Sequence, residues 1–461
     1  MLNLTYCEKI KYELYYYPNV GVKIMADTIN NIPPINPRKV DDVKDAWDGI
    51  ASDFSTDIDV GKIVGDDRKG SSLVDIVNLF TNRYDAIRKI LRNQCGFRES
   101  NTISEVDKEK KRYRSYNIIG IITSSRRTKS GGIMIEIEDK SGVMSAFVRK
   151  EDSASQSLLV DDVVGITGSY GKDSDIFWID RVQFGDILPK HINKGGKDFD
   201  PVSIAFISDI HMGSKYFLED TWDKMMKWMN EDELAKNIKY LVMAGDVCDG
   251  IGIYPGQENN LIFDNAYDQY EMAARKLDLL PDHITPIILP GNHDAVRPAQ
   301  PQPMLEHTIQ QQFNSAIHTG NPCRANLSGI ELLAYHGQGM DDIIPKLDHV
   351  TYENSIEGMK EMLKRRHMTP QWGERSALSP EQQDDMVIKD VPDIFVTGHT
   401  HSHAYEWYRG VPCVVSSTMQ GQTDFMNMLG YASQKGFLTL YNIQNREAKV
   451  VPFHANDDID F

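Results

Sequence analysis

The sequence predicts an α/β protein in which a large C-terminal α/β domain follows a small β-barrel and a helical segment. Three observations predict this order. From about residue 200 onwards, short apolar runs alternate with helical stretches, which is typical of α/β domains. Residues 114–188 contain five short strand-like segments separated by glycine-rich turns. Residues 72–93 carry apolar side chains at the period of a helix.

Residues 1–70 are expected to be mostly a flexible segment, because Pro, Asp, Ser and Gly are frequent and no hydrophobic period is sustained. The first residues carry charges and lack a small-residue cleavage site, so they predict no secretory signal; Met25 is an alternative first residue. Five dispersed cysteines without a C-x-x-C pair indicate a reduced, cytoplasmic protein and argue against a cysteine-based zinc site. No run of 18 apolar residues occurs, so we expect no membrane partner.

Residues 71–113 are predicted to form an amphipathic helix and a charged linker. Ser72 is placed to cap the helix. The helix has one apolar face, made by Leu73, Val77, Phe80, Tyr84, Ile87 and Leu91. This face needs a partner surface, which lies either on the same chain or on another subunit. The following stretch "SEVDKEKKRYRS" indicates a charged, solvated linker.

Residues 114–188 are predicted to form a small barrel. The strand order, the tight turn in "EDKSG" and the late strand "DVVGITG" resemble an OB-fold of the nucleic-acid-binding type. Basic residues lie where its rim would be: Arg126, Arg127, Lys129, Arg149 and Lys150. Such barrels also serve as protein-docking modules, so both alternatives stay open. The net charge of −17 excludes nucleic-acid binding by bulk attraction, and any contact needs local basic patches, metals or a basic partner.

Five apolar runs in residues 200–461 each end at residues that bind metals or transfer protons. The endings are "SDIHMG", "AGDVCDG", "PGNHDAV", "AYHGQG" and "TGHTHSH". Taken alone, Asp209 and His211 fit either a metal site or an ordinary hydrogen-bonded pair. Five such endings at the same strand end predict one shared site. Two divalent ions there would clamp both oxygens of a phosphoryl displacement.

These motifs, D-x-H, G-D-x-x-D, G-N-H-D, a lone His and G-H-x-H, resemble those of the calcineurin-like metallophosphoesterases. The resemblance implies a two-sheet β-sandwich flanked by helices and a site with two divalent ions. Mn²⁺ or Mg²⁺ is expected, and iron or zinc would also fit the ligands. By the same resemblance, one ion is held by Asp209, His211 and His401, the other by Asn292, His336 and His399, with Asp246 as the bridge, His293 as the general acid and Asp249 as the residue that orients it.

Two further residues are weighed beside this set. Arg297, in "GNHDAVRP", is a candidate for binding the substrate phosphate, with an ordinary salt bridge as the alternative. His403 continues the alternation of His399 and His401, and we expect it to support the site rather than to bind metal.

The order of helix, barrel and phosphoesterase domain is typical of fewer proteins than the metal-site motifs alone. With the stretches "DAVRPAQPQPML" and "YHGQGMDDII", it resembles the small subunits of archaeal family-D DNA polymerases over about residues 72–440. The resemblance implies a 3′→5′ proofreading exonuclease for DNA replication. It also implies a heterodimer with a large polymerizing subunit, DNA as substrate, and contact with the sliding clamp through the holoenzyme.

Two other classes of function remain open. One is a catalytically silent structural polymerase subunit, against which the complete ligand set speaks. The other is a free-standing nucleotide phosphodiesterase, against which the barrel and the amphipathic helix speak.

Overall fold

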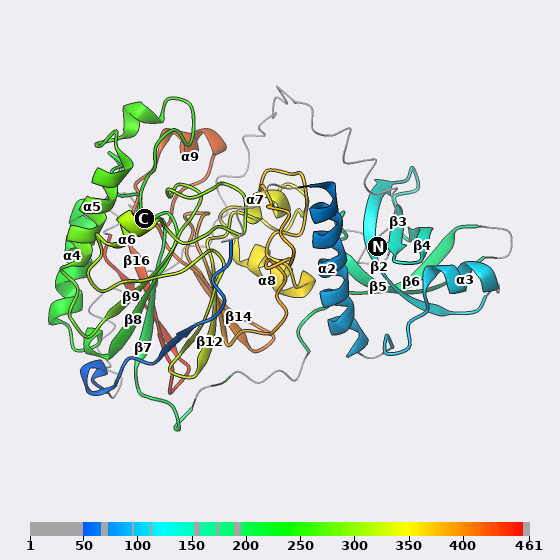
Figure 1. Ribbon diagram of the computed structural model, residues 1–461, viewed down its shortest axis with the longest axis horizontal. Helices are drawn as coiled ribbons and strands as arrows, with labels where there is room; N and C mark the ends of the chain where they lie inside the picture. Colours follow the sequence, from blue (N-terminus) through cyan, green and yellow to red (C-terminus); the bar gives the residue numbers. More distant parts are fainter. Residues whose placement is uncertain are drawn as a thin grey trace, which may run out of the picture.

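The computed structural model describes residues 49–65, 72–94, 96–110, 113–151, 157–171, 175–188, 194 and 196–454 (Figure 1). Residues 1–48, and with them the alternative start Met25, lie outside the described residues. Among the described residues, no helix is long and apolar enough to cross a membrane.

Two mixed six-stranded sheets contain all the described strands after residue 200, together with one strand from the N-terminal part. The first sheet has the order β10-β9-β8-β7-β16-β17. Its strands are β7 (Ser203–Ile207), β8 (Ile238–Ala244), β9 (Thr285–Leu289), β10 (Ile317–His318), β16 (Phe437–Asn442) and β17 (Ala448–Pro452). The second sheet has the order β1-β11-β12-β13-β15-β14. Its strands are β1 (Ile58–Val60), β11 (Cys323–Leu327), β12 (Ile330–Tyr335), β13 (Ile394–Thr397), β14 (Ala404–Tyr408) and β15 (Val411–Val415).

The two sheets pack face to face, and helices cover their outer faces (Figure 1). Buried side chains from both sheets, such as Val242 and Leu332, share one core between them. The helices α4 (Glu219–Glu231) and α5 (Ala266–Leu277) pack on the first sheet, and α7 (Met340–Ile343) and α8 (Ile356–Arg365) pack on the second. Two further short helices are α6 (His307–Gln310) and α9 (Asp424–Leu429).

The five predicted strands of the barrel are confirmed. They close in the order β2-β3-β4-β6-β5 around a core of buried aliphatic and aromatic residues. Their bounds are β2 (Tyr116–Arg127), β3 (Ile133–Asp139), β4 (Gly142–Val148), β5 (Val163–Tyr170) and β6 (Phe177–Gln183). The barrel contacts the sheet region through polar groups: Nε of Arg365 lies 3.0 Å from Oδ1 of Asp162, and Nε of Arg366 donates to the carbonyl of Gly185 at 2.8 Å.

The predicted amphipathic helix is α2 (Leu73–Arg92), and Ser72 caps it in a capping box with Asp75. Most of its predicted apolar face packs on its own chain, which is one of the two alternatives left open by the sequence, whereas Leu73 is exposed. Phe80, Tyr84, Ile87 and Leu91 contact Ile119, Ile121 and Val163 of the barrel and Val387 of the sheet region. The helix therefore lies between the two parts (Figure 1).

Two elements differ from what the sequence predicted for their segments. Strand β1 lies in the segment expected to be mostly flexible and pairs antiparallel with β11. Helix α3 (Ile103–Glu109) lies in the expected charged linker, starts with a capping box at Thr102, and buries Ile103 and Val106 in the barrel core. Both elements are stabilised by contacts with distant residues, which local composition does not reveal.

Candidate metal centre

The predicted ligands lie at the carboxyl ends of five strands from both sheets. In the first sheet, Asp209 follows β7, Asp246 follows β8 and Asn292 follows β9. In the second sheet, His336 follows β12 and His399 follows β13. Because β7, β8 and β9 are parallel, as are β12 and β13, these ends meet at one edge of the two sheets.

The backbone of the predicted ligands is unusual. The φ angle is 50° at Asp209, 53° at His211, 50° at Asp246, 72° at His399 and 53° at His401. Residues other than glycine rarely adopt this left-handed conformation, which costs about 1–3 kcal/mol each. Strain of this kind persists only where the surrounding structure enforces it, and it clusters at functional sites.

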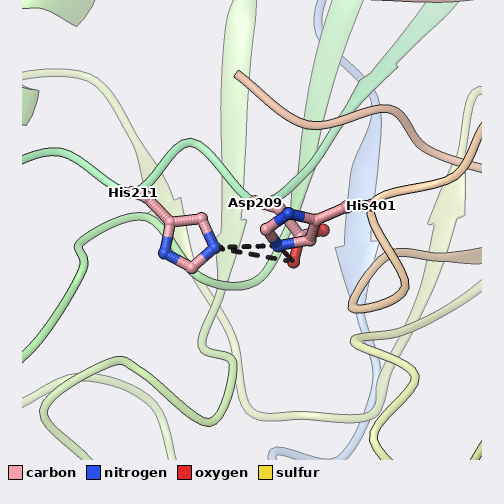
Figure 2. Close-up of side chains that lie close together, drawn as sticks. All are labelled: Asp209, His211 and His401. Atoms are coloured by element: carbon pink, nitrogen blue, oxygen red, sulfur yellow. Dashed lines mark hydrogen bonds and ion pairs between the residues drawn. The ribbon is translucent and has the colours of Figure 1, made fainter. Parts of the chain in front are cut away.

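Three side chains face one another in a first group (Figure 2). Nε2 of His211 lies 3.1 Å from Nε2 of His401, and Oδ1 of Asp209 lies 3.3 Å from Nε2 of His401. The same oxygen lies 4.0 Å from Nε2 of His211 and, among the described residues, receives no hydrogen bond although it is buried. A cation is the group that would satisfy a buried carboxylate oxygen and two facing imidazole nitrogens together.

Asp246 links this group to a second one. Its Oδ2 lies 3.8 Å from Nε2 of His211 and 3.3 Å from Nε2 of His336. Nε2 of His336 in turn lies 2.9 Å from Oδ1 of Asn292. The ligand atoms of Asp209, Asp246 and His336 all lie within 4.8 Å of one another. These Asp and His side chains can therefore hold metal ions, and one oxygen of Asp246 faces both groups.

A backbone hydrogen bond fixes the orientation of the His336 ring. Its Nδ1 donates to the carbonyl of Ala244 at 2.9 Å, which leaves Nε2 free to face Asp246 and Asn292. The backbone at Gly245 passes so close to the ring that a Cβ atom there would overlap Nδ1 of His336. At Gly398, a Cβ atom would overlap Ser208 and Asp209. The glycines beside these motifs are needed for close approach.

His399 is held by a carboxylate that sequence reasoning missed. Its Nε2 lies 3.0 Å from Oδ2 of Asp341, and the hydroxyl of Tyr352 donates to Oδ1 of that carboxylate at 2.9 Å. Nδ1 is therefore the ring nitrogen that remains for a metal. The only sequence signal was the acidic pair in "GMDD" shortly after His336, and nothing in its spacing separated Asp341 from an exposed residue.

Asp249 orients a different ring from the one expected. Its Oδ1 lies 2.9 Å from Nδ1 of His211 and accepts from Nε2 of Gln420 at 3.0 Å. Nδ1 of His293 instead donates to the backbone carbonyl of Asp249 at 2.7 Å. The backbone N–H of His293 donates to Oδ1 of Asp246 at 2.8 Å. Thus the backbone of Asp249, rather than its carboxylate, sets the orientation of His293.

The charges of the centre favour bound cations. Burial raises the pKa of Asp209, but the close contact with His401 and the charges of His401 and His336 outweigh this and lower it to about 2. Burial lowers the pKa of His336, but the charges of Asp246 and Asp209 outweigh it and raise this pKa to about 10. The buried carboxylates thus remain ionised and favour protonated histidines beside them. A bound metal ion would supply this positive charge in place of the protons.

Three other motif residues form contacts with side chains and backbone groups outside the proposed ligand set. Arg297 pairs with Glu381 and donates to the carbonyls of residues 299 and 301, as in the salt-bridge alternative; a contact with the substrate phosphate stays a prediction. Asp294 accepts from the hydroxyl of Tyr270 and from the N–H of Gly291, both at 2.8 Å, and burial raises its pKa to about 6. Nε2 of His403 lies 2.9 Å from Oγ1 of Thr439.

Comparison with known proteins gives the family. A family model for the B-type subunits of DNA polymerases alpha and epsilon matches residues 204–406, which include the five strand ends. The chain is 36% identical over 418 residues to the DNA polymerase II small subunit of Archaeoglobus fulgidus, covering 89% of this chain and 82% of that protein. It is 34% identical to the protein of the same name from Thermoplasma acidophilum, covering 84% of this chain and 80% of that protein.

The protein of the same name from Methanocaldococcus jannaschii is 33% identical, over 86% of this chain and 68% of that protein. A solved structure of TiaS, a tRNAIle2 agmatidine synthetase, overlaps 21% of this chain and 23% of its own with 24% identity and a TM-score of 0.16, too low to carry an argument. The identity and coverage of the archaeal relatives establish that this chain belongs to the family of DNA polymerase II small subunits.

Proposed function

We propose that this chain is a two-metal 3′→5′ DNA exonuclease and the small subunit of a heterodimeric DNA polymerase. One observation carries the nuclease proposal: Oδ2 of Asp246 faces His211 on one side and His336 on the other. A carboxylate between two ligand groups is what a two-ion phosphodiesterase needs.

In this proposal the two six-stranded sheets, apart from β1, form a metallophosphoesterase domain of residues 200–461, and the barrel of residues 114–188 is an OB-fold. Asp209, His211 and His401 would hold one ion, Asn292, His336 and His399 the other, and Asp246 both. Two divalent ions, with Mn²⁺ favoured and Mg²⁺, iron or zinc as alternatives, would polarise the phosphate and stabilise the charge that develops on it. Despite burial, the neighbouring histidines keep the pKa values of Asp209 and Asp246 below the usual range, so both carboxylates are ionised. The imidazoles of His211, His336 and His399 are each held through one ring nitrogen, which leaves the other nitrogen for a metal ion.

The remaining residues position the substrate and move a proton. Nδ1 of His293 is committed to the carbonyl of Asp249, so Nε2 is the atom that would deliver a proton to the leaving 3′-oxygen. The backbone N–H of His293 donates to Oδ1 of Asp246, which fixes the position of the proposed acid relative to the proposed bridging carboxylate. The polymerizing partner would be a large subunit, through which the complex would reach the sliding clamp. The net charge of −17 favours a basic partner to supply most of the DNA affinity.

The decisive experiment is a nuclease assay on the purified chain with single-stranded DNA labelled at the 5′ or the 3′ end. Stepwise shortening from the 3′ end, dependent on Mn²⁺ or Mg²⁺ and absent from Asp246→Asn, is the expected result. Co-purification of a large subunit separates the alternatives. An associated chain without hydrolysis under any metal would indicate the structural subunit, and hydrolysis of nucleotides by a chain that never associates would indicate the free phosphodiesterase.

A further inference from the structure

A basic groove lies along α2, on a face of the helix beside its buried stripe. It is a cavity of about 960 Å³ lined by Asp85, Arg88, Lys89, Arg92, Gly96 and Arg98. The residues of α2 in this set recur at helical spacing, so they share one face of the helix. Arg181 of β6 adjoins the groove: its guanidinium carbon lies 5.6 Å from the centroid of the Phe97 ring, and a side chain at Gly96 would collide with the guanidinium.

The groove is positive in a chain whose net charge is −17. Its one lining carboxylate, Asp85, is paired with Lys140, with Nζ 2.6 Å from Oδ2. Among the described residues, none of the five cations Arg88, Lys89, Arg92, Arg98 and Arg181 forms an ion pair with a carboxylate. Five unpaired like charges along one groove repel one another, and an anionic ligand would relieve this repulsion.

The helix dipole does not account for the whole cluster. Lys89 and Arg92 lie in the last turn of α2, where cations compensate the dipole. Arg98 lies beyond the helix, and Arg181 comes from the barrel, so neither serves that purpose. Cations from a helix and a loop line the groove, and a cation from a strand lies next to it. Several cations in one groove match the successive phosphates of a nucleic-acid strand.

We propose that this groove binds the phosphate backbone of a single nucleic-acid strand, away from the metal centre. The choice of DNA over an acidic protein segment rests on the proposed nuclease function and on the expectation of a basic partner. The affinity of the groove alone is modest, because the rest of the surface repels DNA; non-specific contacts of this kind have Kd values of about 10⁻⁴–10⁻⁶ M at physiological salt.

The test measures fluorescence anisotropy of a labelled oligothymidylate with the full chain at low salt, with EDTA present. EDTA prevents hydrolysis, so the result does not depend on whether the nuclease proposal is right. Two variants remove two groove cations each: Arg88→Gln with Arg92→Gln, and Lys89→Gln with Arg98→Gln. The second pair is exposed, so it remains informative if the half-buried Arg88 affects folding. The matched control, Lys227→Gln with Arg275→Gln, removes two exposed cations on α4 and α5.

Each groove variant should weaken binding and reduce the slope of log K against log salt by about 1.4, since each lost phosphate contact on a single strand contributes about 0.7. The control should keep the slope of the unmodified chain. An unchanged slope in both groove variants, or an equal loss in the control, would overturn the proposal. A competition experiment gives a further check. If polyglutamate displaces the oligonucleotide as effectively as unlabelled DNA of equal charge, the proposal is also overturned, because the groove would then suit an acidic protein segment.

Discussion

Nε2 of His399 lies 3.0 Å from Oδ2 of Asp341, and this contact leaves Nδ1 as the nitrogen of His399 that could bind a metal ion. The charge and hydrogen bond of Asp341 raise the pKa of His399 against the effect of burial. A carboxylate behind a ligand imidazole fixes its tautomer and strengthens it as a ligand. With His399 as a ligand, Asp341 would act through it, as a positioning residue.

Replacing Asp341 with Asn should weaken metal binding or activity by about 10–100-fold, the usual effect of removing such a partner. The measurement is a metal titration followed by calorimetry, together with the metal concentration needed for half-maximal hydrolysis. Asp348→Asn makes the same chemical change at an exposed position of the same segment and should have no effect. If both variants bind metal equally well, the contact is only structural.

Asp246 should be the residue on which both ions depend. Asp246→Asn removes the charge shared by His211 and His336, so we expect both ions to bind less tightly. Elemental analysis after dialysis should find fewer than two ions per chain at metal concentrations that saturate the unmodified protein. Two tightly retained ions in this variant would contradict the bridging role.

The sequence predicted the strand ends and α2 because their signals are local. Apolar runs that stop at Asp, His or Asn mark buried strands that end in a site, and the stripe from Phe80 to Leu91 repeats at the helical period. Strand β1 has only three residues and exists by pairing with β11, so its own composition reveals nothing. Helix α3 was hidden in a run of charges, although its capping box Thr102–Glu105 was a usable signal.

Side-chain partners were harder to predict than positions. Spacing brought Asp249 and His293 to one site, but the loop after β8 directs the carboxylate to His211 and the backbone carbonyl to His293. Arg297 lies close to the motifs in sequence, yet its guanidinium reaches Glu381. Such choices depend on the path of the loops in three dimensions, which one sequence does not encode in a readable pattern.

A buried charged cluster joins α2 to the sheet region and should make this junction sensitive to acid. Nε of Arg83 lies 2.7 Å from Oδ2 of Asp384, and Nε2 of His367 lies 2.9 Å from the same oxygen. Burial raises the pKa of Asp384, but His367 and Arg83 outweigh it and lower this pKa. Burial and the charge of Arg83 lower the pKa of His367.

Both shifts make stability fall as the pH falls. A lowered His pKa means that the unfolded chain takes up protons first, so stability declines below a pH of about 6.5. The contribution of Asp384 is present above a pH of about 4 and is lost as the pH falls through its lowered folded-state pKa. Urea unfolding at several pH values checks this. Asp384→Asn should cost about 3–5 kcal/mol at neutral pH, because it leaves Arg83 buried without a counter-charge. Asp385→Asn, which breaks a pair with the exposed Lys62, should cost less than about 1 kcal/mol.

The last prediction separates chemistry from metal binding at His293. Its ring lies 4.7 Å from that of His211 between centroids, and its nitrogen lies within 4.8 Å of ligand atoms of His211 and Asp246, so it is close enough to be either an acid or a ligand. If it protonates the leaving oxygen, His293→Ala should lower DNA hydrolysis by about 10²–10⁴ while metal content and fold stay unchanged. An aryl phosphodiester has a better leaving group and needs less protonation, so its hydrolysis should fall much less. His293→Gln, which keeps a polar side chain without an acid, should resemble the Ala variant. Loss of metal, or an equal slowing of both substrates, would instead make His293 a ligand or a positioning residue.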